Sequence, residues 1–111
     1  MDELRVVSPV EARSLADGGA LLLDVRNEDE WSAGRAPGAL HVSLPELADR
    51  VGDLDPARPV ICVCRSGGRS RRAALLLLEH GVDAANMEGG MIAWVEAGGP
   101  LESDGDGPEI L

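Results

Sequence analysis

The chain has 111 residues, of which 44% are hydrophobic and 27% are charged, a composition typical of one globular domain with an apolar core. Ten basic and twenty acidic residues give a formal net charge of −10, which argues against nucleic acid or an anionic membrane as a partner because like charges repel. The sequence contains no lysine, and this absence excludes a P-loop lysine and a lysine that forms a Schiff base.

The first half of the chain alternates between strands and helices, because apolar runs are separated by capping residues and glycine turns. Ser8 followed by Pro9 predicts the start of a helix, and Gly18 predicts its end. Asn27 can cap a second, short acidic helix that ends near Gly34. The segments predicted in this half are strand 4–7, helix 9–17, strand 20–25, helix 28–33, strand 40–43 and helix 45–51.

The second half continues the alternation with strand 60–64, helix 70–80, strand 83–87 and helix 92–97. This pattern is typical of a parallel sheet with helices on both faces. We therefore predict an α/β fold with three layers, α/β/α, around a central, mainly parallel five-stranded sheet. Residues 1–101 form one domain in this prediction. Residues 102–111 are acidic and glycine-rich with nothing to bury, which predicts a flexible tail.

Cys64 stands at the carboxyl end of the predicted strand 60–64, where open α/β sheets bind their ligands. It leads into a Ser/Gly/Arg loop that contains four of the ten arginines, at positions 65, 69, 71 and 72. Inward N–H groups, a helix N-terminus and arginines stabilise a negative sulfur, and together they can lower a cysteine pKa to roughly 3.5–7.5. The sequence therefore predicts a nucleophilic thiolate at Cys64 beside a site for an anion.

Cys62 has a different interpretation, because a cysteine inside a strand is often a small buried hydrophobe. Cys62 and Cys64 are too close for an ordinary structural disulfide, and free thiols suit a reducing compartment. The sequence has neither an apolar run of the ~20 residues that span a membrane nor the basic start and apolar run of a secretory signal. We therefore expect a cytoplasmic protein without a membrane partner.

The remaining polar residues predict neither a metal site nor a cofactor. The only histidines are His41 and His80, and neither lies at zinc-ligand spacing from the two cysteines. The adjacent carboxylates Asp29 and Glu30 are interpreted as the solvated start of a helix, where negative charge is favourable.

Three segments carry a resemblance to a known family: CRSGGRS at 64–70, LLLDVRNEDEWSAGRAPGALHVSL at 21–44 and GGMIAWVEAGGP at 89–100. They resemble the active-site loop, the strand with its acidic helix and turn, and the closing element of the rhodanese family. The three motifs occur along the chain in the same order as in the family, and the resemblance covers residues 4–101. One departure is visible, since the family turn usually has His and Ile where this chain has Arg35 and Ala36. It affects the local packing rather than the chemistry at Cys64.

The resemblance implies a sulfurtransferase. In that family a cysteine thiolate takes sulfane sulfur from an anionic donor such as thiosulfate, holds it as a persulfide, and passes it to a thiol, protein or cyanide acceptor. Carried over by position, Cys64 is the catalytic nucleophile and Asp24 is a supporting residue near the loop. The implied donor-binding cradle consists of Arg65, Ser66, Gly67, Gly68, Arg69 and Ser70.

Two alternatives stay open. Phosphatases and arsenate reductases of the cell-cycle phosphatase type share this fold, but their loops place five residues between the cysteine and the arginine. Only four residues separate Cys64 from Arg69, and the smaller ring favours a sulfur atom over a tetrahedral phosphate. The second alternative is a carrier or docking module that accepts and delivers persulfide without useful turnover of small molecules.

Overall fold

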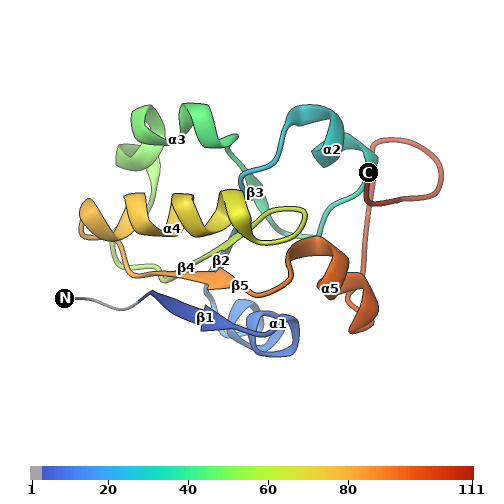
Figure 1. Cartoon of the computed structure of the whole chain (residues 1–111), viewed down its shortest axis with the longest axis horizontal. Coiled ribbons are helices and arrows are strands. Elements are labelled where there is room, and N and C mark those ends of the chain that lie inside the picture. Colours follow the sequence, from blue (N-terminus) through green and yellow to red (C-terminus); the bar gives the residue numbers. More distant parts are fainter. Residues whose placement is uncertain (1–3) are drawn as a thin grey trace.

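A five-stranded parallel sheet forms the centre of the computed structural model, which describes residues 4–111 (Figure 1). The strand order is β1-β5-β4-β2-β3, and every pairing is parallel. The strands are β1 (Arg5–Val7), β2 (Leu21–Asp24), β3 (Leu40–His41), β4 (Val60–Val63) and β5 (Ala84–Met87). The predicted parallel five-stranded sheet is confirmed, and β4 lies at its middle.

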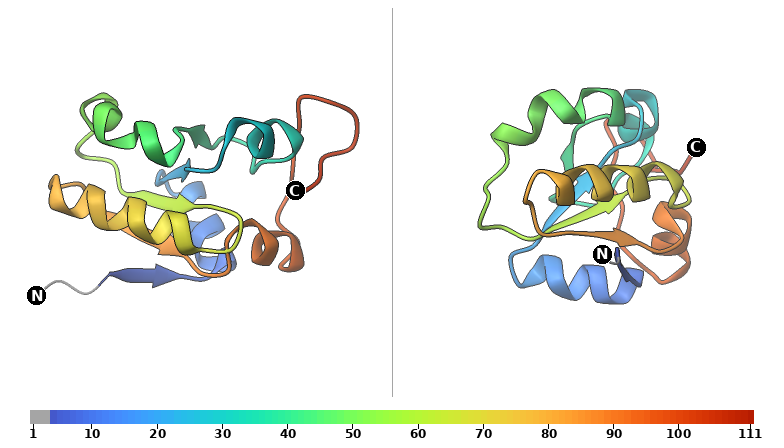
Figure 2. Two further views of the ribbon diagram at one scale, coloured as in Figure 1. Left: turned by 45° about the horizontal axis from the view of Figure 1, so that its top comes forward. Right: turned by 60° about the vertical axis from the view of Figure 1, so that its left-hand side comes forward.

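Helices cover both faces of the sheet. They are α1 (Pro9–Asp17), α2 (Glu28–Ala33), α3 (Leu44–Arg50), α4 (Gly68–Glu79) and α5 (Gly90–Glu96), with a 3₁₀ turn at Val51–Asp53. Helices α3 and α4 pack on one face, and α1 and α5 pack on the other, as the two views of Figure 2 show. The predicted three-layer arrangement is therefore confirmed. Across residues 4–111 no helix has the length and apolar character needed to cross a membrane.

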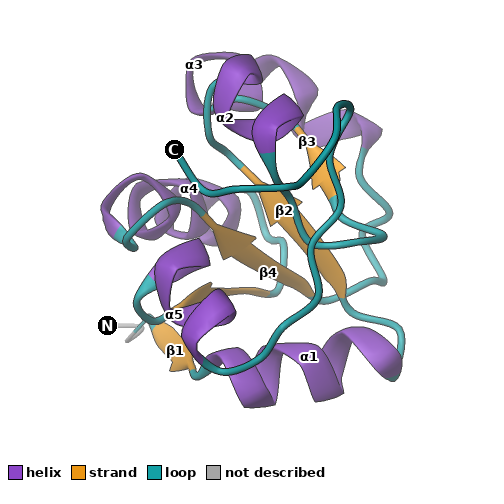
Figure 3. Cartoon of the chain, turned by 90° about the vertical axis from the view of Figure 1, so that its right-hand side faces the viewer, coloured by secondary structure: helices purple, strands orange, loops and turns teal. Residues whose placement is uncertain are grey.

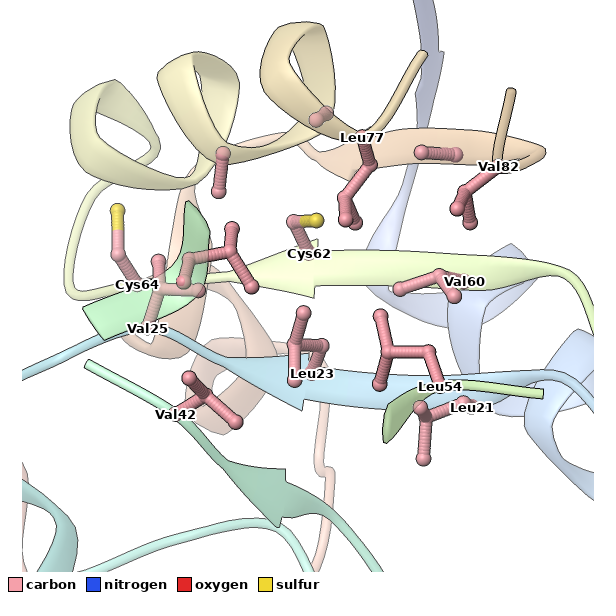
Figure 4. Packing of buried hydrophobic residues seen from close by; sticks show 14 residues of the cluster. Leu21, Leu23, Val25, Val42, Leu54, Val60, Cys62, Cys64, Leu77 and Val82 are labelled. Carbon is pink, nitrogen blue, oxygen red and sulfur yellow. The ribbon is translucent and has the colours of Figure 1, made fainter. Parts of the chain in front are cut away.

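The two layers of core follow from the alternation of side chains along β4. Val60 and Cys62 pack with Leu77 of α4 on one face of the sheet (Figure 4), whereas Ile61 and Val63 belong to the apolar cluster on the other face. Successive side chains of a strand point to opposite faces, so a fully buried strand must be apolar at every position. Cys62 is completely buried, as expected for a cysteine that acts as a small hydrophobe.

Helices α4 and α5 begin two residues earlier than the sequence predicts, at Gly68 and Gly90. The sequence analysis places these glycines in loops because glycine is unfavourable inside a helix. At the N-terminal end the conformational freedom of glycine is useful instead. Gly67, which precedes α4, has a φ of +117°, and this left-handed conformation turns the chain from the β4 loop directly into the helix.

The C-terminal segment packs more closely than the sequence analysis expects. Its backbone pairs with Arg35 through Glu102, and the Glu109 amide donates to the carbonyl of Ala33 at 2.9 Å. Ile110 is partly buried against the apolar cluster on the α5 side of the sheet. Residues 102–111 therefore bury some apolar surface, contrary to the expectation, because two apolar residues, Ile110 and Leu111, at the end of an acidic run are a weak signal in the sequence.

Gly90 provides a test of how the start of α5 supports the loop after β4. Its φ is +58°, and a Cβ atom there would overlap the Cys64 carbonyl and lie 2.5 Å from the Arg65 carbonyl oxygen. We expect Gly90→Ala to lower the free energy of unfolding by at least about 2 kcal/mol, from backbone strain and overlap together. Urea denaturation measures this change. Gly52→Ala is the control, since its Cβ would meet nothing within 4 Å, and equal losses in the two variants would contradict the prediction.

Candidate active site

The candidate active site lies where the central strand β4 ends and α4 begins. This end of the molecule, with α2, α4 and α5 around it, faces the viewer in Figure 3. In parallel sheets the carboxyl ends of neighbouring strands meet at one edge, so β2 and β5 also deliver residues to this place. The N-terminus of α5 packs against the loop that follows β4. The Met91 amide donates to the Cys64 carbonyl at 2.8 Å, and the Ile92 amide donates to the Arg65 carbonyl at 3.1 Å.

The sulfur of Cys64 is surrounded by hydrogen-bond donors. The Gly67 amide donates to Sγ at 3.1 Å, and the Ser70 hydroxyl lies 3.3 Å from Sγ. Cys64 is only 1% exposed, and its thiol points toward the start of α4 (Figure 4). The structure thus brings Cys64, Gly67 and Ser70 together, as the sequence predicts.

These hydrogen bonds give the thiols of Cys64 and Cys62 different pKa values. Burial by itself raises the pKa of Cys64, but the Ser70 hydroxyl and the backbone amides of Ser70, Gly67 and Ser66 together outweigh it, so this pKa lies below its usual value. Burial and the nearby Cys64 charge raise the pKa of Cys62 to about 12. Because the thiolate is the nucleophilic form, these directions favour Cys64 over Cys62 as the candidate nucleophile.

Asn86 of β5 is a part of the site that the sequence analysis missed. The Ser70 hydroxyl lies 2.6 Å from Asn86 Oδ1, so its one proton is shared between this oxygen and the Cys64 sulfur, and Asn86 Nδ2 donates to the Gly67 carbonyl at 3.2 Å. Asn86 is buried and so braces both residues that contact the sulfur. The available signal was a polar side chain in an otherwise apolar strand, since buried polar groups need partners.

The Arg69 guanidinium is not free to bind an anionic donor, because it forms a bidentate ion pair with the carboxylate of Glu30 in α2. The distances are 2.7 Å from Nη1 to Oε1 and 2.9 Å from Nη2 to Oε2. Glu30 is only 9% exposed, so its interpretation as part of a solvated helix start is wrong. The pairing with Arg69 lowers the pKa of Glu30 despite the opposing effect of burial.

The other predicted site residues lie at the rim of the site or beneath it. Arg65 and Ser66 are exposed, and the Arg65 Nε donates to the main-chain oxygen of Leu111 at 2.8 Å. Gly68 forms the first residue of α4. Asp24 is completely buried and contacts Arg26 rather than the loop, with Arg26 Nη2 2.7 Å from Oδ2. Asp24 therefore contacts the connection between β2 and α2, and its supporting role stays a prediction.

Comparison with known proteins identifies this arrangement. The family model for the rhodanese-like domain matches residues 8–97. The chain belongs to the rhodanese-like domain family. A relative, thiosulfate sulfurtransferase GlpE of Pseudomonas fluorescens, is 34% identical over 95 residues, which cover 85% of this chain and 87% of the relative.

Solved structures share the fold of this chain. A rhodanese-related protein of Thermoplasma volcanium has the same fold, with a TM-score of 0.83 and 24% identity over 88% of this chain and 97% of that one. A protein from Rhodopseudomonas palustris, described as of unknown function and a possible tyrosine phosphatase, has a TM-score of 0.76 and 27% identity over 89% of this chain and 85% of that one. The rhodanese-like fold that the sequence predicts is therefore confirmed.

Arg35, the departure from the usual turn of the rhodanese-like domain, has a structural role here. Its guanidinium lies over the ring of Trp31, 4.8 Å from the centroid, and donates to Asp104 at 2.8 Å. The same side chain lies 3.6 Å from the Glu102 carboxylate. The substitution thus fastens the C-terminal segment to α2 through a cation–π contact and two ion pairs.

The lowered pKa of Cys64 predicts how fast iodoacetamide alkylates this rhodanese-like domain. A lowered pKa gives more thiolate at neutral pH, so the alkylation rate should reach half of its maximum below the ~8.5 of an ordinary cysteine. Ser70→Ala removes a donor to the sulfur and should move this midpoint upward. Mass spectrometry of the modified peptide, over a series of pH values, measures both. Cys62→Ala should leave the profile unchanged, and a Ser70→Ala midpoint equal to that of the wild type would contradict the role given to Ser70.

Proposed function

We propose that this rhodanese-like domain is a sulfurtransferase in which Cys64 carries sulfane sulfur as a persulfide. The observation that carries the proposal is the convergence of the Gly67 amide and the Ser70 hydroxyl on a thiol whose pKa is lowered. Such donors stabilise a negative sulfur both before and after it accepts a second sulfur atom. The relatedness to a protein named thiosulfate sulfurtransferase supports the same activity.

The first half-reaction loads the cysteine. The Cys64 thiolate attacks the outer sulfur of thiosulfate, a new S–S bond forms on Cys64, and the S–S bond of the donor breaks with its electron pair leaving on sulfite. The charge of the thiolate passes to the outer sulfur of the persulfide. The amides around the sulfur then face a persulfide anion in place of a thiolate, so their hydrogen bonds persist through the step.

The second half-reaction unloads it. A nucleophilic acceptor, such as cyanide, a small thiolate or a protein thiolate, attacks the outer sulfur, and the bond to Cys64 Sγ breaks with its electron pair returning to Cys64. Cyanide leaves as thiocyanate, and the Cys64 thiolate is restored. Both half-reactions need only this thiolate and the two substrates, which is consistent with the expectation of no cofactor.

Residues 65–70 form the donor-binding loop in this proposal, and these residues contribute to donor binding in different ways. Backbone amides of Ser66, Gly67 and Ser70 act on the sulfur directly. Arg65 is the exposed cation at the rim, whereas Arg69 is paired with Glu30. Asp24 supports the site from below by holding Arg26. Both cysteines are free thiols, and we place the protein in the reducing cytoplasm on that ground.

The assignment of the nucleophile predicts different results for the two cysteines. After treatment with thiosulfate, the intact wild-type protein should gain about 32 Da, as expected for one added sulfur. Cys64→Ala should gain nothing and form no thiocyanate, because the attacking atom is missing. Cys62→Ala should keep most of the activity, since Cys62 lies inside β4 and the pKa of its thiol is raised to about 12. Equal losses in the two variants would contradict the assignment.

The choice of sulfur over phosphate can be tested with p-nitrophenyl phosphate. We expect no Cys64-dependent hydrolysis above background, because the four residues between Cys64 and Arg69 form a ring too small for a phosphate group, and the Arg69 guanidinium is held by Glu30. Phosphate release that depends on Cys64, without persulfide formation, would make the protein a phosphatase. Persulfide formation without thiocyanate release would instead make it a carrier module.

A further inference from the structure

The Arg69–Glu30 pair fixes a carboxylate beside a site proposed to bind an anion. Glu30 is held from two sides, since the Asn27 amide donates to its Oε1 at 3.1 Å while Arg69 binds both carboxylate oxygens. The first contact is part of the cap of α2, so the carboxylate cannot swing away without loosening that helix. Arg69 is about one third exposed, so its outer edge faces solvent while its charge is matched.

A second pair of opposite charges lies beneath the loop. Asp24 and Arg26 form a second pair, with all of its ionised groups completely buried. Glu30 and Arg69 complete a group of two cations and two anions, so these four residues contribute no net charge beneath the sulfur. Among the loop residues 65–70, Arg65 is the cation without an Asp or Glu partner in residues 4–111, and its Nε donates to the main-chain oxygen of Leu111. Arg65 is exposed, as are Arg71 and Arg72 on α4, and salt screens the effect of exposed charges.

A balanced site favours a particular kind of donor. The amides around Cys64 act on one sulfur atom over a short range, and they suit a donor whose negative charge is confined to that sulfur. A second negative charge on the donor gains little beneath the loop, where no net positive charge compensates for its desolvation. Long-range attraction is also missing, because the chain as a whole carries a formal charge of −10.

We propose that Glu30 is a specificity-determining residue which withdraws Arg69 from donor binding, so that the Cys64 site prefers monoanionic sulfur donors, such as a persulfide carried on a thiol, over free dianions. This inference rests on the proposed sulfurtransferase function and specifies its donor class. With such a donor the Cys64 thiolate attacks the outer sulfur, a new S–S bond forms, and the S–S bond of the donor breaks. The electron pair leaves on the donor's thiolate, so atoms and charge balance without an oxidant.

The experiment compares two donors that differ by one charge. Thiosulfate is a dianion, and methanethiosulfonate replaces one of its oxygens by a methyl group, which leaves a monoanion of similar size. Glu30→Gln keeps an oxygen for the Asn27 amide and removes the charge that balances Arg69. We expect kcat/KM for thiosulfate to rise about tenfold, mainly through a lower KM, and that for methanethiosulfonate to rise about threefold, because the monoanion carries half the charge.

Glu28→Gln is the matched control, because Glu28 is an exposed residue of the same helix and the substitution makes the same change in net charge. It should leave the ratio of the two kcat/KM values at the wild-type level. Glu30→Ala provides a second variant if Glu30→Gln does not fold. A ratio that stays unchanged in the Glu30 variants, or changes equally in Glu28→Gln, overturns the inference.

Failure of this inference is distinguishable from failure of the proposed function. If mass spectrometry finds no sulfur on wild-type Cys64 from either donor, the sulfurtransferase proposal fails and the inference fails with it. If Cys64 takes up sulfur from both donors but the ratio is independent of Glu30, the sulfurtransferase proposal stands and only the role of Glu30 is overturned. The two measurements use the same protein and the same donors.

Discussion

The competition between burial and hydrogen bonding at the Cys64 sulfur is the interaction on which the rest of the site depends. Burial at the end of the central strand disfavours a charged sulfur, as the high pKa of Cys62 shows two residues earlier on the same strand. Around Cys64 the amides of the loop and the Ser70 hydroxyl reverse that effect. The pKa values of Cys62 in β4 and of Cys64 just after it are therefore shifted in opposite directions, and the difference between the two thiols is the presence of hydrogen-bond donors.

These donors reach the sulfur only while the loop keeps its conformation, and three different elements support that conformation. Gly67 turns the chain into α4 with a left-handed conformation. Asn86 of β5 binds Ser70 and the Gly67 carbonyl. The first turn of α5 donates two amides to the carbonyls of Cys64 and Arg65. These supports come from α4, which follows β4, from the neighbouring strand β5, and from α5, which follows β5. The order of the strands in the parallel sheet therefore brings all three supports to the loop.

Charge is distributed around the site in pairs rather than as a cluster of cations. Asp24 binds Arg26, and Glu30 binds Arg69. A buried ion pair contributes little net stability but is costly to break, so these pairs fix the connection between β2 and α2 against the loop. The result is a site in which the Ser70 hydroxyl and backbone amides, rather than unpaired arginines, stabilise negative charge on the sulfur.

Local patterns in the sequence determined the fold class, the sheet and most helix positions, and they indicated Cys64 as the candidate nucleophile. These features depend on residues close together in the chain: alternating apolar runs, caps such as Ser8, and the loop that follows Cys64. Only the tertiary structure decided that Glu30 neutralises Arg69 and that Asn86 braces Ser70, because these partners are 39 and 16 residues apart. Their pairing depends on which elements lie side by side. Asn86 differs from its neighbours only as a polar residue in an apolar strand, and Glu30 resembles any acidic residue at a helix start, so neither local pattern identifies the partner.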